Sequence, residues 1–197
     1  MPRQRPRRHI AEDASAAIEW LHDRLPPVAI LDFTASAMVK RDQYAALADG
    51  IEVRATADQH DLLAGREDFL AAVKWVAANG ASVGIDSTRL AIGGDSAGGN
   101  LAAAVSIWSR DNGGPKLRLQ LLAYPVTDAA ARTDSYHLFN DGYGLNAPTM
   151  EWFFDHYTPE KSSRDDWRAS PIRAKSLAGL PPALVITAGY DPLRDEG

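Results

Sequence analysis

Gly93-Gly94-Asp95-Ser96-Ala97-Gly98-Gly99-Asn100 follows a short apolar run, residues 89–92, and precedes an alanine-rich stretch, residues 101–110. Residues 94–98 match the pattern Gly-x-Ser-x-Gly, in which a serine stands on a tight turn between a strand and a helix. Glycine on both sides removes side chains that would collide there and tolerates unusual backbone angles. The N-terminus of the following helix would face the place where an oxyanion forms. The pattern predicts Ser96 as a nucleophile; the alternative is a glycine-rich turn with a bystander serine.

The length and composition are those of one ordinary globular domain. The chain has 197 residues, 45% hydrophobic and 24% charged, which is enough to bury a real core. The net charge of -5 gives no reason to expect nucleic acid or an anionic membrane as a partner, and the arginine-rich residues 3–8 form either a basic arm or a solvated terminus. No apolar segment approaches the ~20 residues that span a bilayer, and no secretory signal is visible. With no cysteine, disulfides are excluded and a cytoplasmic location is expected.

Apolar runs and helical periodicity alternate along the chain. The pattern predicts strands at residues 28–31, 50–54, 89–92, 117–126 and 183–187, and helices at residues 11–25, 66–78, 101–110 and 148–157. Strands that alternate with helices imply right-handed crossovers and an α/β fold with a mostly parallel sheet and helices on both faces. We expect residues 1–26 to form a basic arm and a helix, and residues 27–197 to form the α/β domain.

Asp191 is the candidate acid. It follows the last predicted strand, and functional groups gather at the carboxyl ends of parallel strands, so Ser96 and Asp191 are expected at the same rim of the sheet. A serine needs a base that takes its proton, and the base needs a third group that holds its tautomer. Asp191 fits that third role; the alternative is a structural Asx turn before proline. Asp95 is expected to bond backbone groups inside the serine turn, and Arg194 and Asp195 to form an ion pair or begin a helix.

From residue 85 to residue 197 the chain resembles the bacterial hormone-sensitive-lipase-type branch of the α/β hydrolases. The matching stretches are Gly93–Asn100, Leu121–Pro125, Ala169–Pro171, Leu180–Ala183 and Tyr190–Gly197. The resemblance implies an incomplete α/β-hydrolase fold and hydrolysis of short-acyl carboxylic esters without metal or cofactor. It implies acyl transfer to Ser96, with Asp191 as the acid and a histidine further along the chain as the base.

The chain departs from this family in two places. None of its histidines follows Asp191. His156 resembles a structural position of the family, and surface or packing roles are expected for His9, His22, His60 and His137. We therefore expect a truncated fragment with weak or no activity. The family's oxyanion loop, His-Gly-Gly-Gly, is also missing. The best-placed residues are Thr34 and Ala35, whose side chains restrict the required backbone angles, while the N–H of Ala97 is retained as one donor.

Two alternatives stay open at this point. A protein with an incomplete triad can bind a small ligand without turnover, as does a plant hormone receptor of the same superfamily branch. An amidase or peptidase would share the same serine turn. For an esterase, the expected partner is a small ester substrate. The last predicted strand, residues 183–187, would be an exposed apolar edge through which copies of the chain self-associate.

Overall fold

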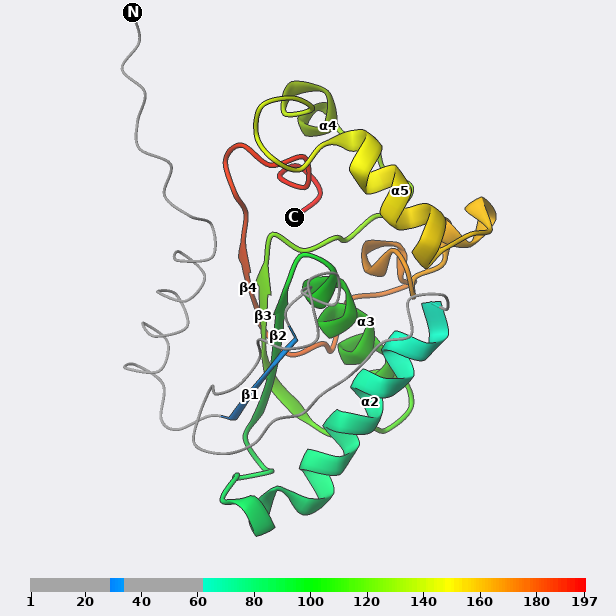
Figure 1. Ribbon diagram of the computed structural model, residues 1–197. Coiled ribbons are helices and arrows are strands. Elements are labelled where there is room, and N and C mark those ends of the chain that lie inside the picture. The colour runs from blue at the N-terminus through cyan, green and yellow to red at the C-terminus, as the bar shows by residue number, and fades with distance from the viewer. Residues whose placement is uncertain (1–28, 34–61) are drawn as a thin grey trace, which may run out of the picture.

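The computed structural model describes residues 29–33 and 62–197 (Figure 1). In this part of the chain four strands form a parallel sheet in the order β1-β2-β3-β4: Ala29–Phe33, Leu90–Asp95, Leu117–Ala123 and Ala183–Ile186. The α/β fold with a parallel sheet is thereby confirmed. The basic arm and helix predicted within residues 1–26, and the strand predicted at residues 50–54, lie outside the described residues.

Three long helices occupy the regions that the sequence pattern indicates. The described helices are α2 (Leu62–Asn79), α3 (Ala97–Asp111), α4 (Asp134–Leu138) and α5 (Ala147–Tyr157), with 3₁₀ turns at Gly80–Val83, Lys161–Asp165 and Pro171–Arg173. The side chain of Asn146 caps α5 by accepting a hydrogen bond from the N–H of Thr149 at 2.9 Å, and Pro148 lies in its first turn. The short helix α4 carries no periodic signal and was not predicted. No helix in the described ranges is both long and apolar enough to cross a membrane.

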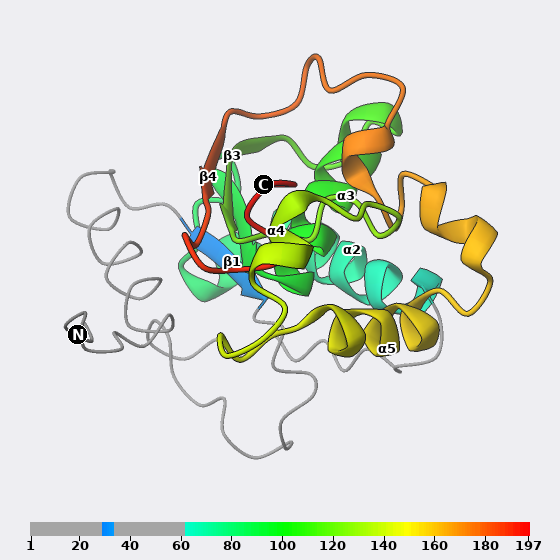
Figure 2. The ribbon, with the colours of Figure 1, turned by 90° about the horizontal axis from the view of Figure 1, so that it is seen from above.

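The strand order follows the chain order, and this decides where the helices lie. Right-handed crossovers that always step across the sheet in the same direction all fall on one face. Figures 1 and 2 show α2, α3 and α5 on one side of the sheet. The sequence predicts helices on both faces of the sheet, and the helices α2, α3 and α5 cover one of them. The helix predicted at residues 11–25 lies outside the described residues.

The core lies between this face of the sheet and helices α2 and α3. Phe69, Val73 and Val76 of α2 are completely buried in the same apolar cluster as Leu90 and Ile92 of β2. Full burial of side chains of this size stabilises the folded state by about 1.5–3 kcal/mol each. This packing holds the helices against β2 and so fixes the connection from β2 into α3.

We expect Phe69→Ala to lower the free energy of unfolding by about 3–5 kcal/mol, because it leaves a cavity between α2 and the sheet. Trp75→Ala is a matched control in the same helix. Trp75 is 48% exposed, and its truncation should cost about 1 kcal/mol or less. Urea unfolding followed by circular dichroism measures both variants. Equal losses in the two would contradict the placement of Phe69 in the core.

Candidate active site

Ser96 stands between β2 and α3 in a backbone conformation that side chains rarely adopt. Its φ is 51° and its ψ is -117°. In the described part of the chain, the other non-glycine residue with a positive φ is Tyr124, at 35°. Such angles cost on the order of 1–3 kcal/mol, so the surrounding structure must hold them in place. The strand-turn-helix arrangement predicted from the glycine pattern is confirmed.

Backbone hydrogen bonds hold Ser96 in this conformation. Its N–H donates to the carbonyl oxygen of Ala123 at 2.9 Å, and its own carbonyl oxygen accepts from the N–H of Val126 at 3.1 Å. The same oxygen accepts from the N–H of Asn100 at 3.2 Å, within the first turn of α3. We call residues 123–127, at the end of β3, the clamp loop. Its residues hydrogen-bond both the N–H and the carbonyl oxygen of Ser96.

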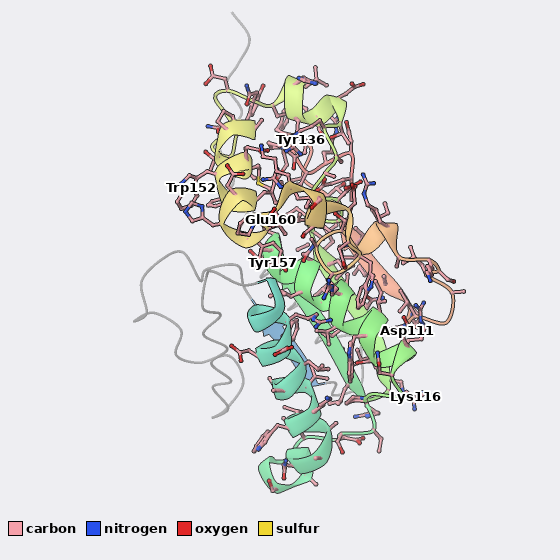
Figure 3. All side chains as sticks on the ribbon, turned by 90° about the vertical axis from the view of Figure 1, so that its right-hand side faces the viewer. Asp111, Lys116, Tyr136, Trp152, Tyr157 and Glu160 are labelled. Carbon is pink, nitrogen blue, oxygen red and sulfur yellow. The ribbon has the colours of Figure 1, made fainter. Side chains whose placement is uncertain are left out.

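Asn100 attaches the first turn of α3 to two other segments. Its side chain is buried, and its Nδ2 donates to the carbonyl oxygens of Val126 at 2.8 Å and Ala169 at 2.7 Å. The hydroxyl of Tyr157, at the end of α5, donates to its Oδ1 at 3.4 Å. Figure 3 shows Tyr157 where α5 meets the upper ends of α2 and α3. Asn100 therefore fixes the N-terminus of α3 relative to the clamp loop and α5.

Asp191 follows β4 and lies at the same edge of the sheet as Ser96, because the carboxyl ends of parallel strands share one edge. Its carboxyl is buried, and Oδ1 accepts a hydrogen bond from the N–H of Leu193 at 2.8 Å. The Asx turn weighed from the sequence is thus present. Burial raises the pKa of Asp191, and the hydrogen bond from Leu193 opposes that rise.

We call residues 191–197 the Asp191 turn, and α4 fastens it on one side. The N–H of Ser135 donates to Oδ2 of Asp195 at 2.9 Å, and the Ser135 hydroxyl donates to the carbonyl oxygen of Pro192 at 2.5 Å. Arg194 and Asp195 form an ion pair at 2.7 Å, which confirms that prediction. Sequence reasoning missed α4, although α4 supplies these contacts. The signal in the sequence is weak, since only Asp134 in its first turn fits a helix start.

An apolar cluster also anchors the Asp191 turn. Leu193 is 1% exposed and packs with residues from the segment between β3 and α4, from α4 and α5, and from the segment before β4: Val126, Ala129, Tyr136, Met150, Phe154 and Ala169. This cluster is separate from the core under α2 and α3. It joins the segments between β3 and β4 to the edge of the sheet that carries Ser96 and Asp191.

Four other predicted site residues, all around Ser96, lie in the described part of the chain. Ala97 is exposed and is the first residue of α3, so its N–H is one of those at a helix N-terminus that have no acceptor within the helix. Gly94 and Gly98 are buried, and Asp95 is half-buried at the end of β2. Thr34 and Ala35, the predicted second oxyanion donors, lie outside the described residues.

Two of the five histidines lie in the described part of the chain. His156 is exposed on α5, where its Nδ1 lies 2.7 Å from the carbonyl oxygen of Trp152. The ring centroids of His156 and Trp152 are 4.2 Å apart. His137 is exposed in the last turn of α4. His137 is a surface residue, as predicted, and His156 also lies at the surface. His9, His22 and His60 lie outside the described residues. Among the described side chains, no group of three or more His, Cys, Asp or Glu is placed to hold a metal ion.

Comparison with known proteins covers the region of this site. Residues 55–197 match the family model for the α/β hydrolase fold. The chain belongs to the α/β hydrolase family. It is 44% identical over 147 residues to the carboxylic ester hydrolase LipN of Mycobacterium tuberculosis, covering 72% of this chain and 39% of LipN. It is 40% identical over 134 residues to the ethyl acetate hydrolase of Pseudomonas putida, covering 66% of this chain and 42% of that enzyme.

Solved structures of esterases are also similar to this chain. A thermostable esterase from Pseudomonas putida ECU1011 is 49% identical, with a TM-score of 0.66, over 68% of this chain and 42% of that one. This α/β hydrolase chain therefore spans less than half the length of these relatives. The resemblance to hormone-sensitive-lipase-type esterases, drawn from the sequence, is confirmed.

Gly99 of α3 packs closely against Pro125 of the clamp loop in this α/β hydrolase. A Cβ there would lie 2.8 Å from Cβ of Pro125 and 3.2 Å from the carbonyl oxygen of Gly94. Alanine favours a helix over glycine by about 1 kcal/mol, but this overlap should make Gly99→Ala destabilising by about 1–3 kcal/mol. Thermal unfolding followed by circular dichroism measures the change.

Gly189→Ala is the control for this experiment, because nothing lies within 4 Å of a Cβ at that position. It should be neutral or stabilise the protein by up to about 1 kcal/mol. A Gly99→Ala variant as stable as Gly189→Ala would show that the clamp loop does not press on α3.

Proposed function

We propose that this α/β hydrolase chain reacts with short-acyl carboxylic esters through Ser96. The observation that carries the proposal is the positive φ of a serine at the beginning of a 15-residue helix. Ser96 Oγ attacks the ester carbonyl, the alcohol leaves, and water then hydrolyses the acyl-enzyme and restores the serine. Negative charge develops on the carbonyl oxygen of the substrate, where the N–H of Ala97 and the positive end of α3 stabilise it.

The names of the relatives support esters as the substrate class, since they include a carboxylic ester hydrolase, an ethyl acetate hydrolase and a carboxylesterase. Asp191 is proposed as the acid that orients a base. Its buried carboxyl lies at the same edge of the sheet as Ser96, and only Oδ1 is engaged by a described partner. No histidine follows Asp191 in these 197 residues. We therefore propose that the chain by itself turns over slowly.

We expect the 197-residue chain to hydrolyse p-nitrophenyl butyrate about 10⁴-fold or more slowly than a full-length relative such as the ethyl acetate hydrolase. The reason is that the members of a triad act as a unit. Ser96→Ala should abolish the remaining rate and the acylated species seen by intact-protein mass spectrometry. Asp191→Asn keeps an oxygen that accepts from Leu193, so its fold is expected to be retained. Because Asp191 acts through a base, and no histidine follows it in these 197 residues, the rate of this variant should stay close to that of the wild-type chain.

Each result of this assay has a defined meaning. Equal rates in the wild type and Ser96→Ala would remove Ser96 as the nucleophile. A wild-type rate within tenfold of the relative's would contradict slow turnover. Faster cleavage of p-nitrobutyranilide than of the ester would favour an amidase. Binding of a small ester analogue without any acylation would favour a non-catalytic binding protein.

We also propose that copies of the chain associate through β4. Among the described strands, β4 pairs only with β3, so its outer edge presents N–H and C=O groups. Leu184 and Val185 are 38% and 40% exposed and, as neighbours in a strand, point to opposite faces of the sheet. An identical edge on a second copy matches this one in both hydrogen bonding and apolar character.

Val185→Lys should shift the chain towards the monomer, because a charge on an edge strand opposes edge-to-edge pairing. Size-exclusion chromatography with light scattering at several concentrations measures the effect. Glu67→Lys, at an exposed position of α2, is the control for the change in charge. A wild type that is monomeric at all concentrations would overturn association through β4.

A further inference from the structure

Glu196 is a buried carboxyl that the proposed ester chemistry does not use. It is 6% exposed, and its Oε1 accepts a hydrogen bond from the N–H of Thr127 at 3.3 Å. Its Oε2 is buried and has no hydrogen-bond partner in the described part of the chain. A carboxylate with one weak partner is costly to bury, so the neutral carboxylic acid is favoured here.

The charged groups around Glu196 also favour its neutral form. Asp128, which follows the clamp loop, and Asp191, in its own turn, both raise the pKa of Glu196, whereas Arg132 lowers it. Arg132 is itself paired with Glu151 of α5. Burial is the largest cause, and together these effects raise the pKa of Glu196 from 4.5 to about 8.

Helix α4 contributes one further titratable group, Tyr136, whose pKa is raised by burial and by the charge of Glu196. The Tyr136 hydroxyl is buried without a hydrogen-bond partner among the described residues. Figure 3 places Tyr136 between α4 and the rest of the protein. The groups around Glu196 are thus a phenol, two carboxyls and one arginine. Of these, Asp128 is itself paired with Arg173 at 2.9 Å, and the arginine is paired with Glu151.

Through Thr127, Glu196 is connected to the nucleophile turn. The Thr127 hydroxyl donates to the backbone carbonyl oxygen of Glu196 at 2.5 Å, so both the side chain and the backbone of Glu196 hold this residue. Thr127 is the last residue of the clamp loop and follows Val126, whose N–H binds the carbonyl oxygen of Ser96. Two adjacent residues of the clamp loop, Val126 and Thr127, therefore hydrogen-bond Ser96 and the Asp191 turn, respectively.

We propose that Glu196, as a neutral carboxylic acid, is a positioning residue that holds the Asp191 turn against the clamp loop through its two hydrogen bonds to Thr127. We call these two hydrogen bonds the lock. Loss of its proton would place a third carboxylate beside Asp128 and Asp191 and loosen that lock. The consequence for catalysis rests on the proposed function, because it requires that Ser96 and Asp191 act together. The lock itself is a property of the fold and is testable without any turnover.

The decisive measurement is the pH dependence of the lock in the intact chain. Because the pKa of Glu196 is higher in the folded state than its ordinary value, the folded state holds the proton more tightly between pH 4.5 and about 8. Stability should be highest at the acidic end of this window and fall as the pH rises through it. Urea unfolding at several pH values gives the slope of the free energy of unfolding against pH. For the wild type this slope should correspond to about one more proton bound to the folded than to the unfolded state. In Glu196→Gln, which imitates the neutral acid, most of that difference should vanish, with a smaller part left from Asp191.

Hydrogen exchange reports the lock directly. The protection factors of the Thr127 and Ser96 amides should fall about tenfold or more between about pH 6 and pH 9 in the wild type and stay constant in Glu196→Gln. Glu160→Gln is the matched control. Glu160 is exposed at the beginning of the 3₁₀ turn after α5 (Figure 3), and its replacement should leave the wild-type pH dependence intact.

Parallel pH profiles in the wild type and Glu196→Gln would overturn the proposal. If Glu196→Gln does not fold, a ¹³C titration of the Glu196 carboxyl in the wild type decides instead, and a midpoint near its ordinary value would overturn the proposal. The Ser96-dependent ester rate should fall above about pH 8 in the wild type but not in Glu196→Gln. If no variant reacts with esters, the proposed function fails, while the exchange data still decide the role of Glu196.

Discussion

The two backbone hydrogen bonds between Ser96 and the clamp loop are the contacts on which the site depends. The φ of Ser96 costs on the order of 1–3 kcal/mol, and each such hydrogen bond contributes about 0.5–1.5 kcal/mol, so the pair is of the right size to offset the strain. The loop is fixed in turn, because the N–H of Tyr124 donates to the carbonyl oxygen of Ile186 at 2.5 Å. The conformation of Ser96 therefore depends on the position of β4, although β4 is not its neighbour in the sheet.

The strand order explains why one loop holds both halves of the site. Ser96 follows β2 and Asp191 follows β4, and β3 lies between them. The clamp loop at the end of β3 therefore has the nucleophile turn on one side and the Asp191 turn on the other. Since right-handed crossovers place the connecting helices on one face, α4 and α5 also reach this edge from the same side.

The turn at Ser96 and the long helices are predictable from the sequence, because local rules of backbone geometry and apolar periodicity determine them. The turn at Ser96 was found because few residue types fit a tight strand-to-helix turn, and α2, α3 and α5 because their apolar periodicity is long. β3 was predicted to reach residue 126 but ends at Ala123, because Tyr124 takes a positive φ that tyrosine does not signal. Glu196 is held by Thr127, far away in the sequence, and the sequence around Glu196 carries no sign of its burial.

Features that stabilise the fold and features that destabilise it lie in different parts of the structure. The core under α2 and α3 is built from apolar side chains in ordinary helices and strands, so it contributes stability. Arg66, Ser109 and Arg164 each bury one polar atom without a described partner. The non-glycine residues with positive φ in the described part both lie at the carboxyl edge of the sheet, and Tyr136 and Glu196 bury the other two such atoms. An apolar replacement of Tyr136 would avoid about 1–3 kcal/mol for its unpaired hydroxyl, whereas one of Glu196 would also leave the N–H of Thr127 without its acceptor. Polar groups retained at such a cost, beside a strained serine, are typical of a functional site rather than of a packing layer.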